Sequence, residues 1–220
     1  MDFWNNTMFL GNPLMEWAQA LGFFIGSILL ARLVYAMFKG IFKRWAARTT
    51  SQWDDVIVDQ VEEPIALGIV ILGFWLGYDH LQFGEAADSF MNHVFTILIA
   101  LDLTWLVARL LDSMVATVIL HLDERTDGSM VAQFGPILQK TLRSLVWILG
   151  IISGLTNAGY DVGALLAGVG IGGLAMAMAA KDFVANIFGG VTIFIDKPFV
   201  VGDRIKVNGI DGNVQEIGIR

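Results

Sequence analysis

Long hydrophobic segments are the feature that most restricts how this chain can fold. A helix needs about 20 apolar residues to cross a hydrocarbon core about 30 Å thick. Hydrophobic residues make up 55% of the 220 residues and charged residues only 16%, whereas soluble domains are about 45–50% apolar and about 25% charged. The sequence therefore predicts an all-α membrane protein with about five transmembrane helices per subunit. The predicted spans are residues 14–38, 64–83, 93–120, 136–158 and 162–180.

The distribution of Lys and Arg predicts how these spans are oriented. Residues 1–31, 49–108 and 144–180 contain neither Lys nor Arg, whereas basic residues follow the first and fifth spans and surround the connection after the third, so every second loop is basic. Lys and Arg accumulate in cytoplasmic loops. Five crossings then place the N-terminus outside and the C-terminus in the cytoplasm. Because the first basic residue is Arg32, the N-terminus lacks the basic region of a cleaved signal, and the first span is expected to be retained.

Four regions are expected along the chain. Residues 1–135 form three peripheral spans, and residues 136–180 form two inner spans that include a pore helix at 162–180. An amphipathic interfacial helix follows at 181–196. Residues 197–220 begin a small cytoplasmic β domain.

Several function classes are disfavoured by composition. The net charge of −7 and the absence of a basic cluster among aromatics argue against nucleic-acid binding. The chain has no cysteine, and His80, His93 and His121 lack metal-ligand spacing. No Ser/His/Asp motif is present. We expect neither an enzyme with catalytic residues nor a metal site or cofactor.

The segment GVGIGGLAMAMAAKD, residues 168–182, contains a literal G-x-G-x-x-G in Gly168, Gly170 and Gly173. A dinucleotide-binding turn needs a preceding strand and a βαβ unit. This run instead lies inside the fifth predicted span and follows the sequence GALLA. The nucleotide-binding interpretation is therefore rejected.

Helical packing explains more of this run. At about 100° per residue, its small residues fall on two separate faces, with Ile171, Leu174 and Met178 between them. Small residues let helices approach closely in lipid, and two such faces suit a helix with a neighbour on each side, as in a closed ring with a central pore. A tightly packed central helix of a monomeric bundle is the alternative. One face contains Gly163, Ala167, Gly170, Gly173 and Ala177, and the other contains Ala164, Gly168, Gly172, Ala175 and Ala179.

The pattern changes at Lys181 and Asp182. Apolar residues from Phe183 to Ile195 recur at three- and four-residue spacing opposite small or polar ones such as Asn186, which predicts an amphipathic helix. Asp182 suits the N-cap of a new helix, so a kink is expected there, at the cytoplasmic mouth of the pore. The alternative is that the two charges simply end a span at the headgroups.

Two strands are expected after Pro198. Residues 204–207 alternate as a strand, Asn208-Gly209 and Asp211-Gly212 are turn dipeptides, and residues 214–219 alternate again.

At these residues the chain resembles the small-conductance mechanosensitive channel family. The resemblance lies in GVGIGGLAMAMAA, AKDFVANIFGGV and IDKPFVVGDRIKVNGIDGNVQEIGIR, about the last 60 residues, while the upstream spans are similar to the extra helices of longer members. It implies a homo-heptamer in the bacterial inner membrane that contacts membrane lipids, passes ions and releases small osmolytes on hypo-osmotic shock. Two apolar rings at Leu174 and Met178 would form its constriction. The C-terminal cytoplasmic part of the family would be truncated.

This chain departs from the family pattern at two positions. The best-known pattern has Leu in both rings, whereas the second ring here is Met178, a flexible thioether. The kink position can be glycine in the family, whereas here it is Asp182.

A secondary transporter is the alternative function. Charged residues within spans are usually functional, and the third span contains Asp102, Arg109 and Asp112. Arg109 and Asp112 are three residues apart on one helix, so a pair within the helix is the favoured structural explanation.

Overall fold

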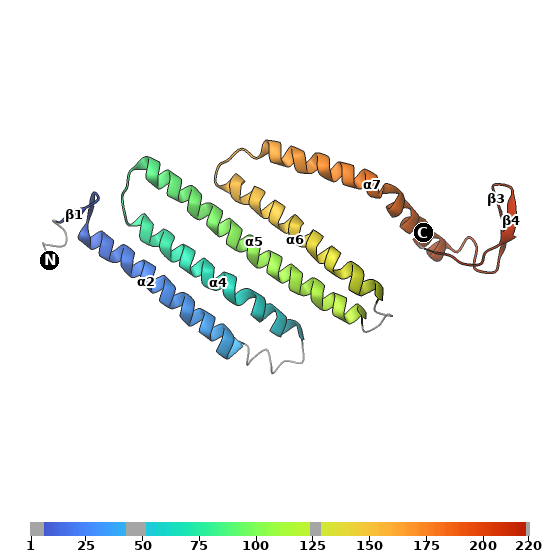
Figure 1. The fold of residues 1–220 in the computed structure, drawn as a ribbon, viewed down its shortest axis with the longest axis horizontal. Coiled ribbons are helices and arrows are strands. Elements are labelled where there is room, and N and C mark those ends of the chain that lie inside the picture. Colours follow the sequence, from blue (N-terminus) through green and yellow to red (C-terminus); the bar gives the residue numbers. More distant parts are fainter. Residues whose placement is uncertain (1–6, 43–51, 124–128, 219–220) are drawn as a thin grey trace. The chain divides into compact units, whose positions relative to one another are not determined.

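A computed structural model describes residues 7–42, 52–123 and 129–218 (Figure 1). The chain divides into two compact units, Met1–Val162 and Gly163–Arg220. Each unit is described by itself.

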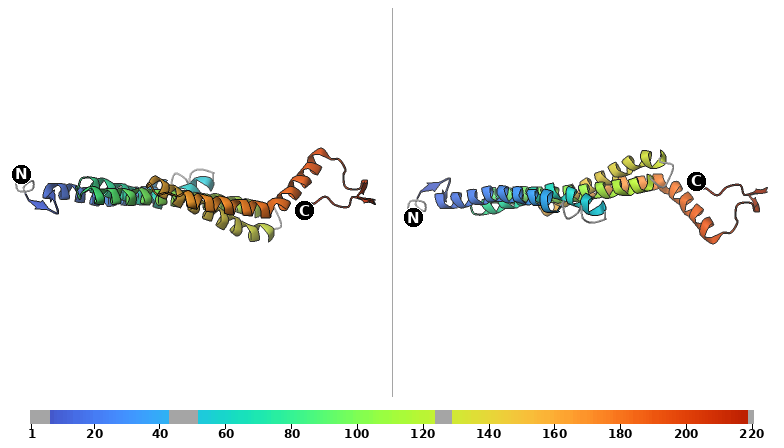
Figure 2. Two further views of the ribbon diagram at one scale, coloured as in Figure 1. Left: turned by 90° about the horizontal axis from the view of Figure 1, so that it is seen from above. Right: turned by 90° about the horizontal axis from the view of Figure 1, so that it is seen from below.

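The first unit is a single layer of helices. Each helix packs against the next one along the chain, so the described part of the unit is an up-and-down row (Figure 1). Seen edge-on in Figure 2, the helices lie close to one plane, which one end of α6 leaves. Short elements precede and follow its first helix: β1 (Met8–Phe9), β2 (Asn12–Pro13) and the π-helix η1 (Phe38–Phe42). The four helices are α2 (Leu14–Met37), α4 (Gln52–Asp79), α5 (Glu85–Asp123) and α6 (Ser129–Asn157).

The helices are longer than the apolar segments that predicted them. α2 matches its predicted span within one residue, but α4 begins twelve residues before residue 64 and contains Pro64 in its interior. α5 likewise starts at Glu85 instead of residue 93. Backbone hydrogen bonds within a helix do not need apolar side chains, so polar turns extend each helix beyond the hydrocarbon core.

Four described helices are long and apolar enough to cross a membrane: Leu14–Gly40, Asp59–Asp79, Glu85–Ile119 and Gly163–Asp196. The fourth predicted span, which corresponds to α6, does not meet this criterion. Lys140 and Arg143 lie in its N-terminal half, which leaves the apolar part from Leu145 to Asn157 short. α6 nevertheless packs along α5 more extensively than any other pair of described helices.

The core of the first unit lies in the seams between helices. A Cβ atom added at Gly73 of α4 would lie 2.0 Å from Ser27 Cβ of α2, and one at Gly150 of α6 would lie 2.1 Å from Thr104 Oγ1 of α5. Glycine therefore sets how closely these helices approach. Association in lipid depends on such packing because lipid tails are as apolar as the helix surfaces.

Hydrogen bonds and aromatic contacts join the N-terminal end of the first unit to the connection between α4 and α5. Asn12 is almost fully buried. Its side-chain oxygen accepts a hydrogen bond of 2.7 Å from the Gln82 backbone N–H, and its amide donates one of 3.0 Å to the Gln82 carbonyl. Trp17 of α2 packs edge-on against Phe83, which stacks on Tyr78. The start of α2 is thereby held against the α4–α5 connection.

The second unit begins with α7 (Gly163–Asp196) and ends with a hairpin of β3 (Arg204–Val207) and β4 (Ile210–Asn213). β3 has the predicted bounds. The second strand does not: Asp211-Gly212, predicted as a turn, lies inside β4, and residues 214–218, predicted as a strand, form none.

The Asn208-Gly209 turn explains this correction. Asn208 and Gly209 have positive φ values of 51° and 85°, as a two-residue hairpin turn requires. The turn pairs Val207 directly with Ile210, so the second strand starts at once. Arg204 of β3 therefore lies opposite β4. Its side chain donates hydrogen bonds of 2.9 and 3.2 Å to the Asp211 carboxylate of β4. These hydrogen bonds raise the pKa of the exposed guanidinium.

Candidate functional site

The predicted pore residues all lie on one continuous helix. α7 runs unbroken from Gly163 to Asp196, so Ile171, Leu174 and Met178, spaced by three and four residues, share one face. Their side chains are 71%, 63% and 70% exposed, and α7 has no buried residue.

The small residues of α7 are uncovered within the second unit. A Cβ atom added at Gly168, Gly170, Gly172 or Gly173 would meet nothing within 4 Å among the described residues. Ala167, Ala175 and Ala177 are exposed as well. In α4 and α6, by contrast, the glycines of the seams contact a neighbouring helix. At these residues, neither small face of α7 is covered by another part of the second unit.

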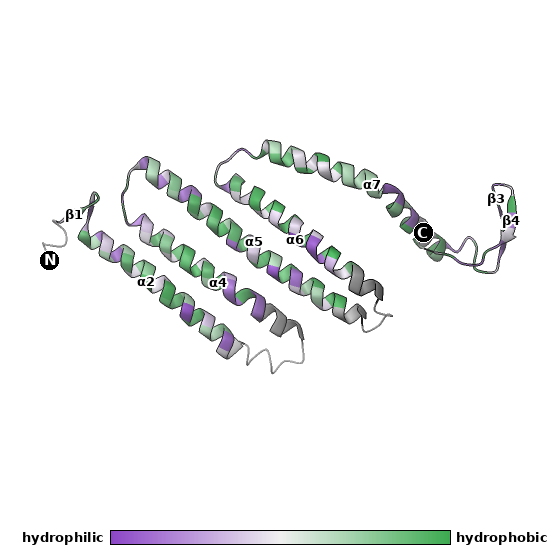
Figure 3. Cartoon of the chain, in the orientation of Figure 1, coloured by the Kyte–Doolittle hydropathy of each residue, from purple (hydrophilic) through white to green (hydrophobic). Residues whose placement is uncertain are grey.

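A kink or break with a second helix beginning at Asp182 was expected, and the second helix is not present. Lys181 and Asp182 lie inside α7, so Asp182 is not the N-cap of a second helix. The helix bends instead of breaking (Figure 2), and Figure 3 shows a hydrophilic band where it bends. Apart from its last residue, Lys181 and Asp182 are the only charged residues of α7. Backbone hydrogen bonding can continue through a bend, so a change of side-chain character does not require a new helix. Asn186 follows on the exposed surface one turn later.

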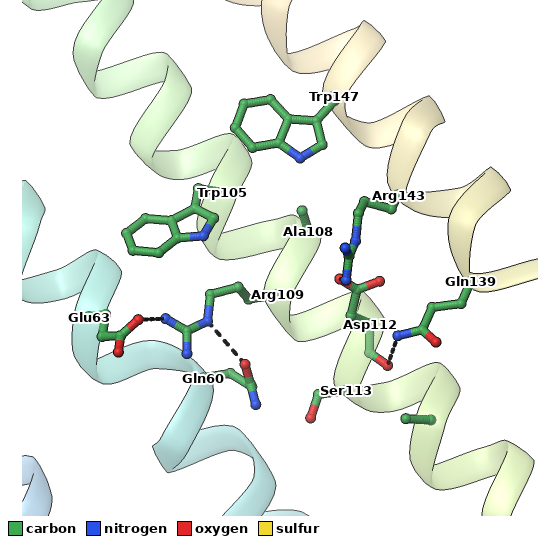
Figure 4. A pocket seen from close by; sticks show the side chains of 11 residues that line it. Gln60, Glu63, Trp105, Ala108, Arg109, Asp112, Ser113, Gln139, Arg143 and Trp147 are labelled. Atoms are coloured by element: carbon green, nitrogen blue, oxygen red, sulfur yellow. Dashed lines mark hydrogen bonds and ion pairs between the residues drawn. The ribbon is translucent and has the colours of Figure 1, made fainter. Parts of the chain in front are cut away.

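A second candidate site is a pocket of 630 Å³ in the first unit, lined by α4, α5 and α6 (Figure 4). Arg109 of α5 forms an ion pair with Glu63 of α4 and donates a hydrogen bond of 3.0 Å to the Gln60 side chain. Its guanidinium lies 5.3 Å from the centre of the Trp105 ring. Asp112 of α5 forms an ion pair with Arg143 of α6. We call this set of residues the charged pocket.

The predicted pair between Arg109 and Asp112 is therefore wrong. The two residues are three positions apart, which separates them by about 60° around the helix. α5 has α4 on one side and α6 on the other. Each charge meets an opposite charge on a different neighbour, and these contacts replace the pair within the helix.

Asp102 lies apart from this pocket. It is absent from the pocket lining, and its carboxylate faces α4, where a Cβ atom added at Gly68 would lie 2.9 Å from Oδ2. Its other oxygen, Oδ1, is buried without a hydrogen-bond partner among the described residues. The structure thus does not bring together the three charges on which the transporter alternative depends.

The partners of these charges were not predicted from the sequence. Gln60 and Glu63 precede the second predicted span, where charges are ordinary, and Arg143 lies in the N-terminal half of the fourth. A signal was nevertheless present: an up-and-down row places the start of α4, the second half of α5 and the start of α6 at one end of the layer. Complementary charges at those positions indicate contacts between helices.

Removing the Arg109 side chain tests the first of these contacts. Arg109→Ala should destabilise the protein by about 1.5–3 kcal/mol, the range for hydrogen bonds to charged groups, because two side-chain contacts to α4 are lost. Arg143→Ala should cost less, since that side chain is half exposed. Unfolding in mixed micelles with increasing sodium dodecyl sulfate measures both. If the double variant loses the sum of the unfolding free energies that Arg109→Ala and Glu63→Ala lose separately, the two residues are not coupled.

Two family models match adjoining parts of the chain. Residues 140–181 match "Mechanosensitive ion channel, transmembrane helices 2/3", and residues 182–220 match "Mechanosensitive ion channel, beta-domain". The first match ends at Lys181 and the second begins at Asp182.

Curated relatives match most of the chain. The small-conductance mechanosensitive channel MscMJ of Methanocaldococcus jannaschii is 34% identical over 91% of this chain and 56% of its own length. An uncharacterized MscS family protein of Aquifex aeolicus is 31% identical over 98% of this chain and 58% of its own length. The chain thus spans a little over half the length of these relatives. No solved structure matches it significantly.

Proposed function

The chain belongs to the small-conductance mechanosensitive channel family, and from this premise we propose that it forms the membrane part of an ion channel opened by membrane tension. The observation that carries the proposal is α7, whose two small-residue faces flank the apolar face of Ile171, Leu174 and Met178 and which has no buried residue.

We propose that copies of α7 assemble side by side around an axis. A helix with one small face suits a dimer, whereas two different faces suit the head-to-tail contacts of a closed ring. Gly168, Gly172 and Ala175 of one copy would face Gly170, Gly173 and Ala177 of the next. The family resemblance sets the expected number of subunits at seven.

Leu174 and Met178 would form the gate of this ring. They lie one turn apart on the face between the two small faces, so each would contribute a ring of apolar side chains toward the axis. A narrow apolar constriction closes a pore by excluding water. Ions would pass only when the rings widen.

Tension would act through the area of the assembly. It favours the conformation that occupies more membrane area, as a ligand favours the state to which it binds better. The layer of α2, α4, α5 and α6 exposes apolar side chains, Figure 3 shows hydrophobic residues along these helices, and the layer would follow the bilayer. Opening would release ions and small osmolytes on hypo-osmotic shock.

We propose a bacterial inner membrane location with the N-terminus outside and the C-terminus in the cytoplasm. The positions of Lys and Arg support this orientation if α6 crosses as well. Its 29 residues amount to about 43 Å of helix, which exceeds the hydrocarbon thickness of about 30 Å.

Recordings from liposome patches containing the purified protein test the function. Suction applied to the patch should produce discrete, reversible current steps whose probability rises steeply with tension. Protein-free liposomes are the control. Solute exchange that saturates with concentration, without unitary current steps, would contradict the proposal and favour a transporter.

A further inference from the structure

The charged pocket is built from three helices, of which α5 is the middle one. α5 packs against both α4 and α6, and it forms the floor of the pocket with Arg109 and Asp112 (Figure 4). Glu63 stands on the α4 side and Arg143 on the α6 side. The volume of 630 Å³ lies within the range of small-molecule sites, about 300–1,000 Å³.

The two ion pairs expose opposite charges at the two sides. The floor residues Arg109 and Asp112 have side chains that are only 22% and 16% exposed, whereas Glu63 and Arg143 are 47% and 52% exposed. A molecule entering the pocket therefore meets an anion on the α4 side and a cation on the α6 side.

Both exposed groups keep hydrogen-bonding capacity. A guanidinium has five N–H donors, and a carboxylate accepts at two oxygens. Arg143 contacts Asp112 through one terminal nitrogen, and Glu63 contacts Arg109 through Oε2. The pocket's two cations and two anions cancel, so neither a purely anionic nor a purely cationic ligand complements it.

The position of the pocket indicates where such a ligand would be found. The charged residues of the pocket lie at the end of the layer that the distribution of Lys and Arg predicts to be cytoplasmic. Trp105 and Trp147 also line the pocket, and tryptophan concentrates at the membrane–water interface.

We propose that the charged pocket binds a phosphoethanolamine zwitterion, with its phosphate at Arg143 and its ammonium at Glu63. Two sources share this chemistry: the headgroup of a phosphatidylethanolamine lipid and a soluble phosphoethanolamine ester. The proposal requires only the membrane-spanning helices and is independent of channel activity.

The test measures binding to delipidated protein in detergent. Three probes are compared by the shift in the thermal unfolding midpoint and by native mass spectrometry: short-chain phosphatidylethanolamine, phosphatidylglycerol of the same chain length, and glycerophosphoethanolamine. Phosphatidylethanolamine should bind at least about tenfold more tightly than phosphatidylglycerol, since a hydrogen bond to a charged group is worth about 1.5–3 kcal/mol. Binding of glycerophosphoethanolamine with similar affinity would identify the soluble source; its failure to bind would identify the lipid.

Charge-neutralising variants separate the two ends of the ligand. Glu63→Gln should weaken phosphatidylethanolamine binding about tenfold and leave phosphatidylglycerol nearly unchanged, whereas Arg143→Gln should weaken both. Arg204→Gln, which removes an exposed cation outside the spans, is the matched control and should change neither. Equal binding of the two lipids by the unaltered protein, or phosphatidylethanolamine binding that survives both pocket substitutions, would overturn the proposal. The comparison of lipids on unaltered protein holds even if a variant fails to fold.

Discussion

Leu174→Ser is expected to open the channel at a much lower tension than the unaltered protein requires. Burying a leucine side chain is worth about 1.5–3 kcal/mol relative to exposing it to water, and serine largely removes this preference. Every subunit of the proposed ring would carry the substitution, so the change in hydration free energy would be multiplied by the number of subunits. Liposome patches measure the effect as the suction needed for half-maximal opening.

Leu165→Ser is the matched control for this prediction. Leu165 lies nine residues before Leu174, about 180° around the same helix, and it is also exposed in its unit. The same chemical change on the opposite face should leave the pore hydration unaltered and shift the threshold far less. An unchanged threshold in Leu174→Ser, or an equal shift in Leu165→Ser, would remove Leu174 from the gate.

Gly73→Ala is expected to destabilise the helix layer markedly. The added Cβ atom would lie 2.0 Å from Ser27 Cβ and 2.4 Å from Ser27 Oγ. The Ser27 Cβ position is set by the backbone of α2, so no side-chain rotation removes the clash, and the two helices must separate. Overpacking of this kind costs about 1–3 kcal/mol. Unfolding in mixed micelles provides the measurement.

Two variants make this result specific to the α2–α4 seam. Gly26→Ala, at a position with no neighbour within 4 Å, should be neutral or slightly stabilising because alanine favours the helix. The double variant Gly73→Ala/Ser27→Gly removes the atom that the new methyl group meets and should recover most of the loss. Failure of this rescue would mean that the seam does not limit stability.

The hairpin shows how far local signals reach. Residues 204–207 were predicted as a strand and form β3, because alternation and the Asn208-Gly209 turn are both local properties. Asp211-Gly212 carries an equally good turn signal, but it lies in β4, where pairing with β3 overrides it. When two turn dipeptides lie close together, the register in which the two strands pair decides which dipeptide forms the turn.

The charges of α5 show the limit of this reasoning. Spacing within one helix predicted that Arg109 pairs with Asp112, and the structure pairs each with another helix. The proposed pore residues are a different case. Helix geometry alone places Ile171, Leu174 and Met178 on one face. The orientation of this face toward a pore remains a proposal, because it depends on other copies of the chain.

The amino-acid sequence by itself determined that this chain resides in a membrane, where its apolar helices lie, and that one of them has two small faces. Each of these properties depends on residues close together in the chain, because a helix satisfies its own backbone hydrogen bonds in lipid. Only the tertiary structure decided that Gly73 meets Ser27 and that Glu63 and Arg143 border one pocket. Such contacts join residues on different helices, and their identity depends on which helices are neighbours and how far one is shifted along the other.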